Sequence, residues 1–212
     1  MLDVETDLEL LGRLREGDED AFVMLVGRYQ QSMLRLARTM VPSHAVAEEA
    51  VQDTWMGVVR GIDRFEGRSS LKTWLFRILA NRARSAGSSE HRHTGGRVPL
   101  GAAPGSSDDL DEGPAVDPSF FDARGQWAEP VDGWGSDSED RLDAATLAPL
   151  LKIALEQLPP RQRQVVLLRD LEGLSGGEVC EVLGVSAGNQ RLLLHRGRNQ
   201  LRAALETVVR KG

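Results

Sequence analysis

The stretch that decides the fold begins at residue 47, where the chain reads AEEAVQDTW, and it continues as RFEGRSSLKTW over residues 64–74. Its apolar residues recur at the 3.6-residue period of a helical stripe that faces a core. In the first part the stripe comprises Val51, Trp55, Val58, Val59 and Ile62. In the second part it comprises Leu71, Trp74, Leu75 and Ile78. This pattern predicts two helices joined by a short polar loop.

The polar residues of these helices predict two surfaces of opposite charge. Gly67 is expected to end the first helical pattern, and Ser69 or Ser70 to cap the second helix by accepting backbone N–H bonds. The outer face of the first helix carries Glu49, Gln52, Asp53, Met56 and Arg60. The outer face of the second carries Thr73, Arg77, Asn81 and Arg84. Taken alone, such faces are more often solvated surface than binding sites.

The same stretch resembles region 2 of the extracytoplasmic-function sigma factors, small bacterial RNA polymerase subunits that select promoters. The matching motifs are Gln52-Asp53-Thr54-Trp55, Arg64-Phe65, Gly67-Arg68-Ser69 and Thr73-Trp74-Leu75-Phe76-Arg77-Ile78 with Asn81. A match of this length at fixed spacing favours functional surfaces over merely solvated ones.

The composition is that of a soluble globular protein with one or two small domains. The chain has 212 residues, of which 41% are hydrophobic and 27% charged. No apolar run approaches the roughly 20 residues that a membrane-spanning helix needs, and the N-terminus lacks the features of a signal peptide. Cys180 is the only cysteine, which excludes an internal disulfide and a thiolate-rich zinc site. We expect a cytoplasmic protein without membrane insertion.

The net charge of −6 and pI near 5.3 argue at first sight against DNA binding. However, the acidic residues crowd the middle of the chain, roughly between Asp108 and Asp140, while arginines are frequent before and after that block. Both ends of the chain are therefore basic, although the net charge of the whole chain is negative.

The chain order predicts a first helical domain at residues 1–90. An amphipathic helix is expected over residues 3–16, and Asp18 is expected to cap a second helix that Pro42 stops. Ser43 is expected to cap the third helix, which leads into the stretch described above. Together these make a four-helix domain.

Residues 91–140 read as an acidic, flexible linker rich in Gly, Ser, Pro and Asp. Its aromatic residues are unusual for an inert tether, and they are Phe120, Phe121, Trp127 and Trp134. Two hypotheses stay open: a solvated tether, or a segment that competes with DNA in the free protein and docks on the polymerase. The pair His91 and His93 is a weak metal signal, since further ligands are missing.

Residues 141–212 predict a second helical domain with a helix-turn-helix. Pro159-Pro160 should separate two helices, and Ser175 with Glu178 should form a capping box. Gly184 permits a tight turn, and Ser186 is expected to cap the last helix. The outward face of that helix is donor-rich and suits DNA, and it carries Arg191, Leu192, His195, Arg196 and Asn199.

This second segment resembles region 4 of the same family. The matching motifs are Leu158-Pro159-Pro160-Arg161-Gln162-Arg163, Leu171-Glu172-Gly173-Leu174-Ser175, Leu183-Gly184-Val185-Ser186, Gly188 and Leu194-His195-Arg196-Gly197-Arg198. It departs from the family at Asn189-Gln190-Arg191-Leu192-Leu193, where members often have Thr-Val and then a Lys/Arg-Ser-Arg run. This departure concerns the residues that read the upstream promoter element.

The resemblance implies an all-α sigma factor with two small domains, partnered by core RNA polymerase, promoter DNA and an anti-sigma factor. It implies a polymerase-binding face of Glu49, Gln52, Asp53 and Met56. It implies contacts to the melted −10 element from Phe65, Arg68, Ser69, Lys72, Arg77, Asn81 and Arg84. The double-stranded −35 element would meet Ser186, Arg191, Leu192, His195, Arg196 and Asn199. No catalytic residue, metal site or cofactor is expected, so we do not expect the protein to be an enzyme.

Two other classes of function are weaker interpretations. A stand-alone helix-turn-helix repressor would need a dimer interface to match two half-sites, and it would not need an acidic face beside a melting loop. An adaptor that does not bind DNA would leave the two basic faces unexplained.

Overall fold

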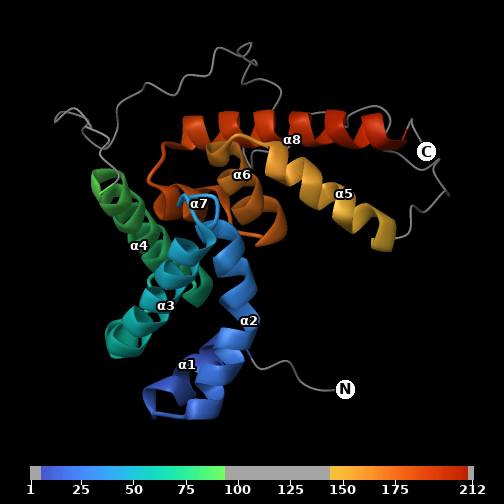
Figure 1. Cartoon of the computed structure of the whole chain (residues 1–212). Helices are drawn as coiled ribbons and strands as arrows, with labels where there is room; N and C mark the ends of the chain where they lie inside the picture. Colours follow the sequence, from blue (N-terminus) through green and yellow to red (C-terminus); the bar gives the residue numbers. More distant parts are fainter. Residues whose placement is uncertain (1–5, 94–143, 210–212) are drawn as a thin grey trace.

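The computed structural model describes residues 6–93 and 144–209, and all secondary structure in these ranges is helical (Figure 1). The first range contains α1 (Asp7–Arg15), α2 (Glu19–Ala37), α3 (His44–Gly61), the 3₁₀ turn η1 (Ile62–Arg64) and α4 (Leu71–His93). The second contains α5 (Ala144–Gln157), α6 (Pro160–Val166), the π-helical turn η3 (Leu167–Leu171), α7 (Gly176–Leu183) and α8 (Ala187–Val209). The predicted all-α class is confirmed.

In the first half α3 packs between α2 and α4, and the predicted apolar stripes supply part of its core. Val51, Val58 and Leu75 are almost completely buried, and Trp55 donates its indole N–H to Gln30 Oε1 at 2.6 Å. The prediction is wrong for one residue of the stripe, because Val59 is 56% exposed. It follows Val58 by about a quarter turn, which carries it past the edge of the buried face.

The predicted starts of three helices in the first half are confirmed. Asp18 accepts the amides of Asp20 and Ala21, Ser43 accepts that of Val46, and Ser70 Oγ accepts that of Thr73. Three other boundaries of the first half differ from prediction. The helical pattern of α3 ends at Gly61, and the turn η1 at Arg64, before the predicted Gly67. The capping box of Thr6 and Glu9 starts α1 at Asp7 instead of residue 3. α2 ends at Ala37, well before Pro42, because the next amides fold into tight turns onto the carbonyls of Leu36 and Ala37.

The second half contains the predicted helix-turn-helix. Ser175 and Glu178 form the capping box of α7, and Gly184 ends that helix at a φ of +68°. Ser186 Oγ accepts the amide of Asn189 in the first turn of α8. The spacing of Val165, Val166, Leu168 and Leu171 predicts that all four lie inside, but Leu171 is 42% exposed because the π-helical turn η3 shifts the side chains out of the 3.6-residue register.

The two halves pack against each other through α4 and α7 (Figure 1). The buried apolar residues of both halves form one continuous cluster. Across the described residues, every helix is too short or too polar to cross a membrane. The contact between α4 and α7 decides which polar residues of α4 reach solvent.

Candidate functional site

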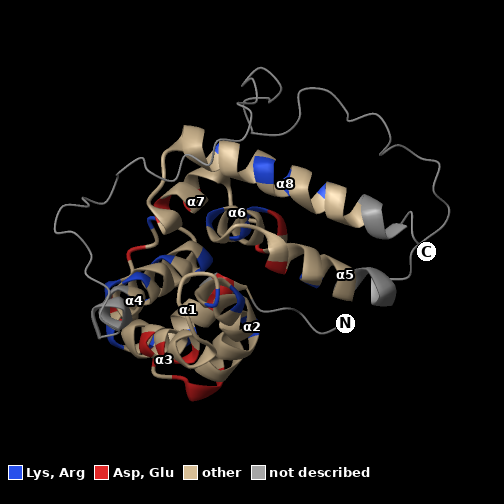
Figure 2. Ribbon diagram, turned by 45° about the horizontal axis from the view of Figure 1, so that its top comes forward, with Lys and Arg blue, Asp and Glu red and all other residues tan. Residues whose placement is uncertain are grey.

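The acidic face of α3 is fully open to solvent. Glu49, Gln52 and Asp53 are exposed, and Met56 is 48% exposed. Their spacing of three or four residues places them on one side of the helix. Acidic residues mark this helix in Figure 2, while the other half of the protein packs on α4.

Apolar side chains extend this face, a feature that the sequence analysis did not predict. Val59 lies one turn beyond Met56, and Val23 of α2 is 67% exposed. Val23 and Val59 line a shallow cavity of about 390 Å³ at the ends of α1 and α3, together with Phe22, Val58 and Ile62. A partner surface could therefore bury apolar area next to the carboxylates.

The loop that precedes α4 carries exposed polar residues on a fixed backbone. Gly67 adopts a φ of +71°, which glycine tolerates without strain. Arg68 is exposed, with Nε 3.1 Å from Glu66 Oε2, and Ser69 is half-buried. On α4, Arg77 and Asn81 are exposed. Arg68, Arg77 and Asn81 thus form an open donor surface on the loop and on the helix, interrupted by the buried Thr73.

Phe65 does not share that exposure. It was expected to contact DNA, but its side chain is only 6% exposed, and its ring centroid lies 5.0 Å from that of Trp74. Its backbone carbonyl accepts a hydrogen bond from Arg15 of α1. The apolar ring is more stable inside the core than in water, so Phe65 anchors the start of the loop.

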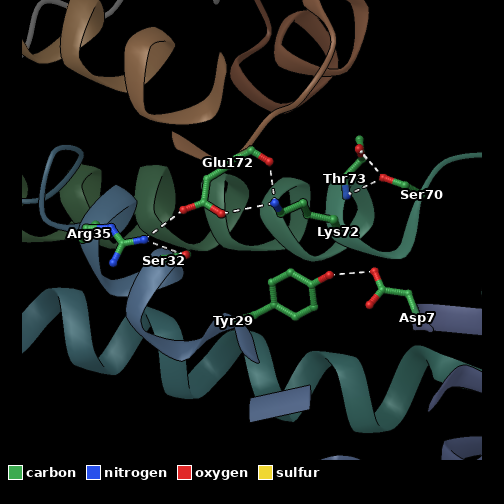
Figure 3. Close-up of polar contacts among 8 residues, drawn as sticks. All are labelled: Asp7, Tyr29, Ser32, Arg35, Ser70, Lys72, Thr73 and Glu172. Atoms are coloured by element: carbon green, nitrogen blue, oxygen red, sulfur yellow. Dashed lines mark hydrogen bonds and ion pairs between the residues drawn. The ribbon is translucent and has the colours of Figure 1, made fainter. Parts of the chain in front are cut away.

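Two basic residues of α4, Lys72 and Arg84, contact the second half of the protein, and Figure 3 shows the contact of Lys72. Lys72 Nζ lies 3.3 Å from Glu172 Oε2, and Arg84 Nη2 donates to the Val182 carbonyl at 3.0 Å. Burial, and secondarily the charge of Arg161, lower the pKa of Arg84. Thr73, predicted on the outer face, is completely buried. On the predicted outer face, Arg77 and Asn81 are thus open, Thr73 is covered, and Arg84 is bonded to α7 although it is exposed.

The outward face of α8 is only partly as predicted. Ser186, Arg191 and Asn199 are exposed, and Leu192 and Arg196 are half-buried. His195 is the exception, with 3% exposure. The Nε2 atom of His195 lies 2.9 Å from the side-chain Nδ2 of Asn199. Burial, and to a smaller extent the charge of Arg196, lower the pKa of His195. His195 is therefore placed to orient Asn199 and does not reach solvent itself.

Two residues that support α8 were not predicted to do so. Arg198 makes a bidentate pair with Asp170 of η3, at 3.0 and 2.5 Å. Gly197 lies where α8 crosses α6, and a Cβ atom there would lie 2.7 Å from Val166 Cγ2. The sequence signal for the glycine was its place in the middle of a helix, where glycine is otherwise unfavourable.

In the ranges 6–93 and 144–209, no three His, Cys, Asp or Glu residues gather as metal ligands would. The side chains of His91 and His93 lie outside the described part, as do the aromatic residues of the linker. Cys180 is half-buried, and burial raises the pKa of its thiol. Cys180 therefore packs on α7 as a small apolar residue.

The fold and these surfaces define an all-helical DNA-binding transcription factor. The family model "Sigma-70 region 2" matches residues 25–93, and "Sigma-70, region 4" matches residues 151–201. The chain is 30% identical over 206 residues to the ECF RNA polymerase sigma-E factor of Escherichia coli (strain K12), with 97% of each chain covered. It is 28% identical over 211 residues to the RNA polymerase sigma-H factor of Pseudomonas aeruginosa, with 100% of each covered. The chain therefore belongs to the extracytoplasmic-function sigma factors of the sigma-70 family.

Solved structures share the fold. One is CnrH in complex with the cytosolic domain of CnrY, with a TM-score of 0.54 at 21% identity, covering 96% of this chain and 99% of the other. Another is the sigma factor RpoE in complex with the anti-sigma factor NepR from Bartonella quintana. Its TM-score is 0.52 at 24% identity, covering 87% of this chain and 96% of the other. The predicted regions 2 and 4 thus correspond to the two packed halves.

Proposed function

We propose that this chain binds core RNA polymerase through α3 and directs it to promoters, opening the −10 element with α4 and reading the −35 element with α8. The observation that carries the proposal is the pairing of two exposed surfaces on adjacent helices. The acidic face of α3 and the open donor surface of Arg68, Arg77 and Asn81 belong to one packed unit. A polymerase held by α3 would therefore have α4 at a fixed position beside it.

The polymerase contact combines charge and apolar area. Glu49 and Asp53 would face the basic helical pair of the polymerase clamp that the family resemblance implies, and Gln52 would add hydrogen bonds. Exposed carboxylates of this kind speed association and fix orientation. Met56 and the neighbouring Val59 offer apolar area that a partner can bury.

The −10 contact requires bases to leave the stack, which costs a few kcal/mol for each base. Contacts to the extruded strand must offset that cost. Arg68, Lys72, Arg77 and Arg84 are suited to phosphates, and Ser69 and Asn81 can also donate to base edges. Phe65, buried beneath the loop, would hold these donors in position.

The −35 contact would place the start of α8 in the major groove, as in other helix-turn-helix proteins. Arg191 and Asn199 are exposed and can reach base edges, while Ser186 at the start of the helix and Arg196 can contact phosphates. Leu192 is a candidate for apolar contact with a thymine methyl group. His195 would act through its hydrogen bond to Asn199.

An anti-sigma factor is proposed as a further partner, because RpoE of Bartonella quintana shares this fold and is held by one. The domain limits 1–90, 91–140 and 141–212 belong to the same proposal. A protein with this task would work in the cytoplasm together with the polymerase.

Gel filtration of the full chain with core RNA polymerase tests the proposal. Co-elution with the polymerase is expected. The repressor interpretation instead requires a dimer that binds DNA and elutes apart from the polymerase. The adaptor interpretation requires no DNA binding in either state.

A further inference from the structure

A largely buried carboxylate links the two halves of the protein. Glu172 lies between η3 and α7, and its side chain is only 9% exposed. One carboxylate oxygen lies 3.0 Å from Arg35 of α2, and the other lies 3.3 Å from Lys72 of α4 (Figure 3). The Lys72 ammonium also donates to the backbone carbonyl of Glu172. Region 4 thus places its own anion on a basic residue of the proposed −10 surface.

A second carboxylate makes a similar contact at the start of α4. Glu178 Oε1 accepts hydrogen bonds from Thr73 Oγ1 at 2.6 Å and from Ser70 Oγ at 3.1 Å. Its Oε2 accepts the Ser175 amide at 2.8 Å as part of the capping box. Burial would raise the pKa of Glu178, but these hydrogen bonds lower it to about 2. The group is therefore an anion at neutral pH.

Hydrogen bonds from side chains to backbone carbonyls extend this interface in both directions. Arg84 donates to the Val182 carbonyl at the end of α7, and Gln164 Nε2 donates to the Thr39 carbonyl at 3.1 Å. Contacts therefore run along α4 from Ser70 to Arg84, and they also hold the end of α2. Arg68, Arg77 and Asn81 lie outside them and stay exposed.

We propose that region 4 is a built-in competitor of single-stranded DNA: in the free protein Glu172 and Glu178 occupy donors of α4 that would otherwise bind strand phosphates. This inference rests on the proposed role of α4. Carboxylate and phosphate oxygens accept hydrogen bonds from the same ammonium, guanidinium and hydroxyl groups. Lys72, Ser70 and Thr73 cannot bind the strand while the glutamates hold them.

The arrangement in which region 4 packs on α4 is the closed arrangement. It leaves the acidic face of α3 open, since Glu49, Gln52 and Asp53 are exposed in it. The protein could therefore meet the polymerase in the closed state while its strand-binding surface stays partly covered. The apparent affinity for free DNA falls in proportion to the fraction of molecules that are open. This would suppress DNA binding by sigma factor that is not on the polymerase.

The test uses the full chain with Glu172→Gln and Glu178→Gln together. Glutamine fits these sites and also supports a capping box, so α7 keeps its start while both charges are lost. The probe is a fluorescein-labelled single-stranded DNA of mixed sequence. We expect about tenfold tighter binding than wild type. Small-angle X-ray scattering should show a larger radius of gyration, because the halves separate.

The matched control is Glu156→Gln with Glu181→Gln, which removes the same charge from two exposed positions of the same half. Its DNA affinity should change less than about twofold, since a general charge effect at these distances is screened by salt. The proposal is overturned if the interface variant binds no more tightly than this control. It is also overturned if the variant expands without binding DNA more tightly, or does not expand.

Arg77→Ala separates this inference from the proposed function of α4. If α4 binds the strand, Arg77→Ala weakens DNA binding both alone and in the interface variant. Weaker binding of Arg77→Ala without a gain in the interface variant overturns only the competition by region 4. If Arg77→Ala changes nothing in either background, the strand-binding role of α4 fails, and the competition fails with it.

Discussion

At the residue scale, Gly197 decides how closely α8 approaches α6. A Cβ atom at this position would lie 2.7 Å from Val166 Cγ2 and 3.5 Å from the Gln162 carbonyl. Val166 is 1% exposed and β-branched, so it cannot move aside cheaply. The close crossing of α8 over α6 therefore depends on a single missing methyl group.

We expect Gly197→Ala to lower the free energy of unfolding by about 1–3 kcal/mol, the usual cost of overpacking. Gly188→Ala is the matched control, because Gly188 lies in the same helix and a Cβ atom there would have no neighbour within 4 Å. There alanine should be neutral or stabilise by up to about 1 kcal/mol. Urea unfolding of both variants measures this. Equal stabilities for the two variants would contradict the packing argument.

His195 gives a pH prediction of known sign. Burial and Arg196 lower its pKa below 6.5, so the unfolded chain takes up the proton more readily than the folded chain. Below about pH 6.5 this favours unfolding. The midpoint of thermal unfolding should fall between pH 7.5 and 5.5, and His195→Gln should reduce that fall. An identical pH dependence in the variant would show that His195 is not the group responsible.

At the element scale, local signals were readable from the sequence and long-range contacts were not. Ser43, Ser175 and Gly184 mark boundaries through bonds within a few residues, so the caps and the turn were predicted correctly. Periodicity failed at Leu171, where a π-helical turn changes the register. Periodicity also placed Thr73 on an outer face, because it does not reveal which distant helix packs there, so the contact of Thr73 with Glu178 could not be predicted.

The same limit applies to the candidate site. Phe65 and His195 lie in motifs of the family, and the motif positions alone did not reveal that both side chains are buried. Glu172 belongs to a region 4 motif and Glu178 to a capping box, and neither pattern indicates a role toward α4. Only the packing of α7 on α4 shows that role.

The exposed face of α8 gives a prediction for DNA binding. If Arg191 contacts a base bidentately, Arg191→Ala should weaken binding to a duplex that carries the −35 element by about 1–3 kcal/mol. If Arg191 contacts phosphate, the variant should instead show a weaker dependence of DNA affinity on salt concentration, the salt slope. The duplex can be obtained by selection from a random library. Lys152→Ala, exposed on α5, is the control and should bind normally. An unchanged affinity and salt slope in Arg191→Ala would remove it from the interface.

At the scale of the whole molecule, the closed arrangement should resist mild acid. The groups that face Glu178 are the hydroxyls of Ser70 and Thr73 from α4 and Ser175 from its own cap, with the Glu172–Lys72 pair nearby. A carboxylate whose pKa is lowered from 4.5 to about 2 contributes its full stabilisation above pH 4.5 and loses it as the pH falls toward 2.

The radius of gyration should therefore stay constant between pH 8 and 5.5 in small-angle scattering, and closure should weaken only below about pH 4.5. An expansion already at pH 6 would mean that a group other than Glu178 controls the contact. The Glu178→Gln variant is the control, since it should lose the acid transition that belongs to this carboxylate.

The central claim is that the acidic face of α3 holds the polymerase, and Asp53→Lys tests it most directly. Asp53 is exposed, so the charge reversal should leave the fold intact while it sets like charges against a basic partner, at a cost of several kcal/mol. The control is Glu156→Lys, an exposed reversal on α5. In gel filtration with core RNA polymerase, wild type and Glu156→Lys should co-elute with the enzyme, and a folded Asp53→Lys should elute apart from it. Co-elution of Asp53→Lys with the polymerase at wild-type affinity would contradict the account.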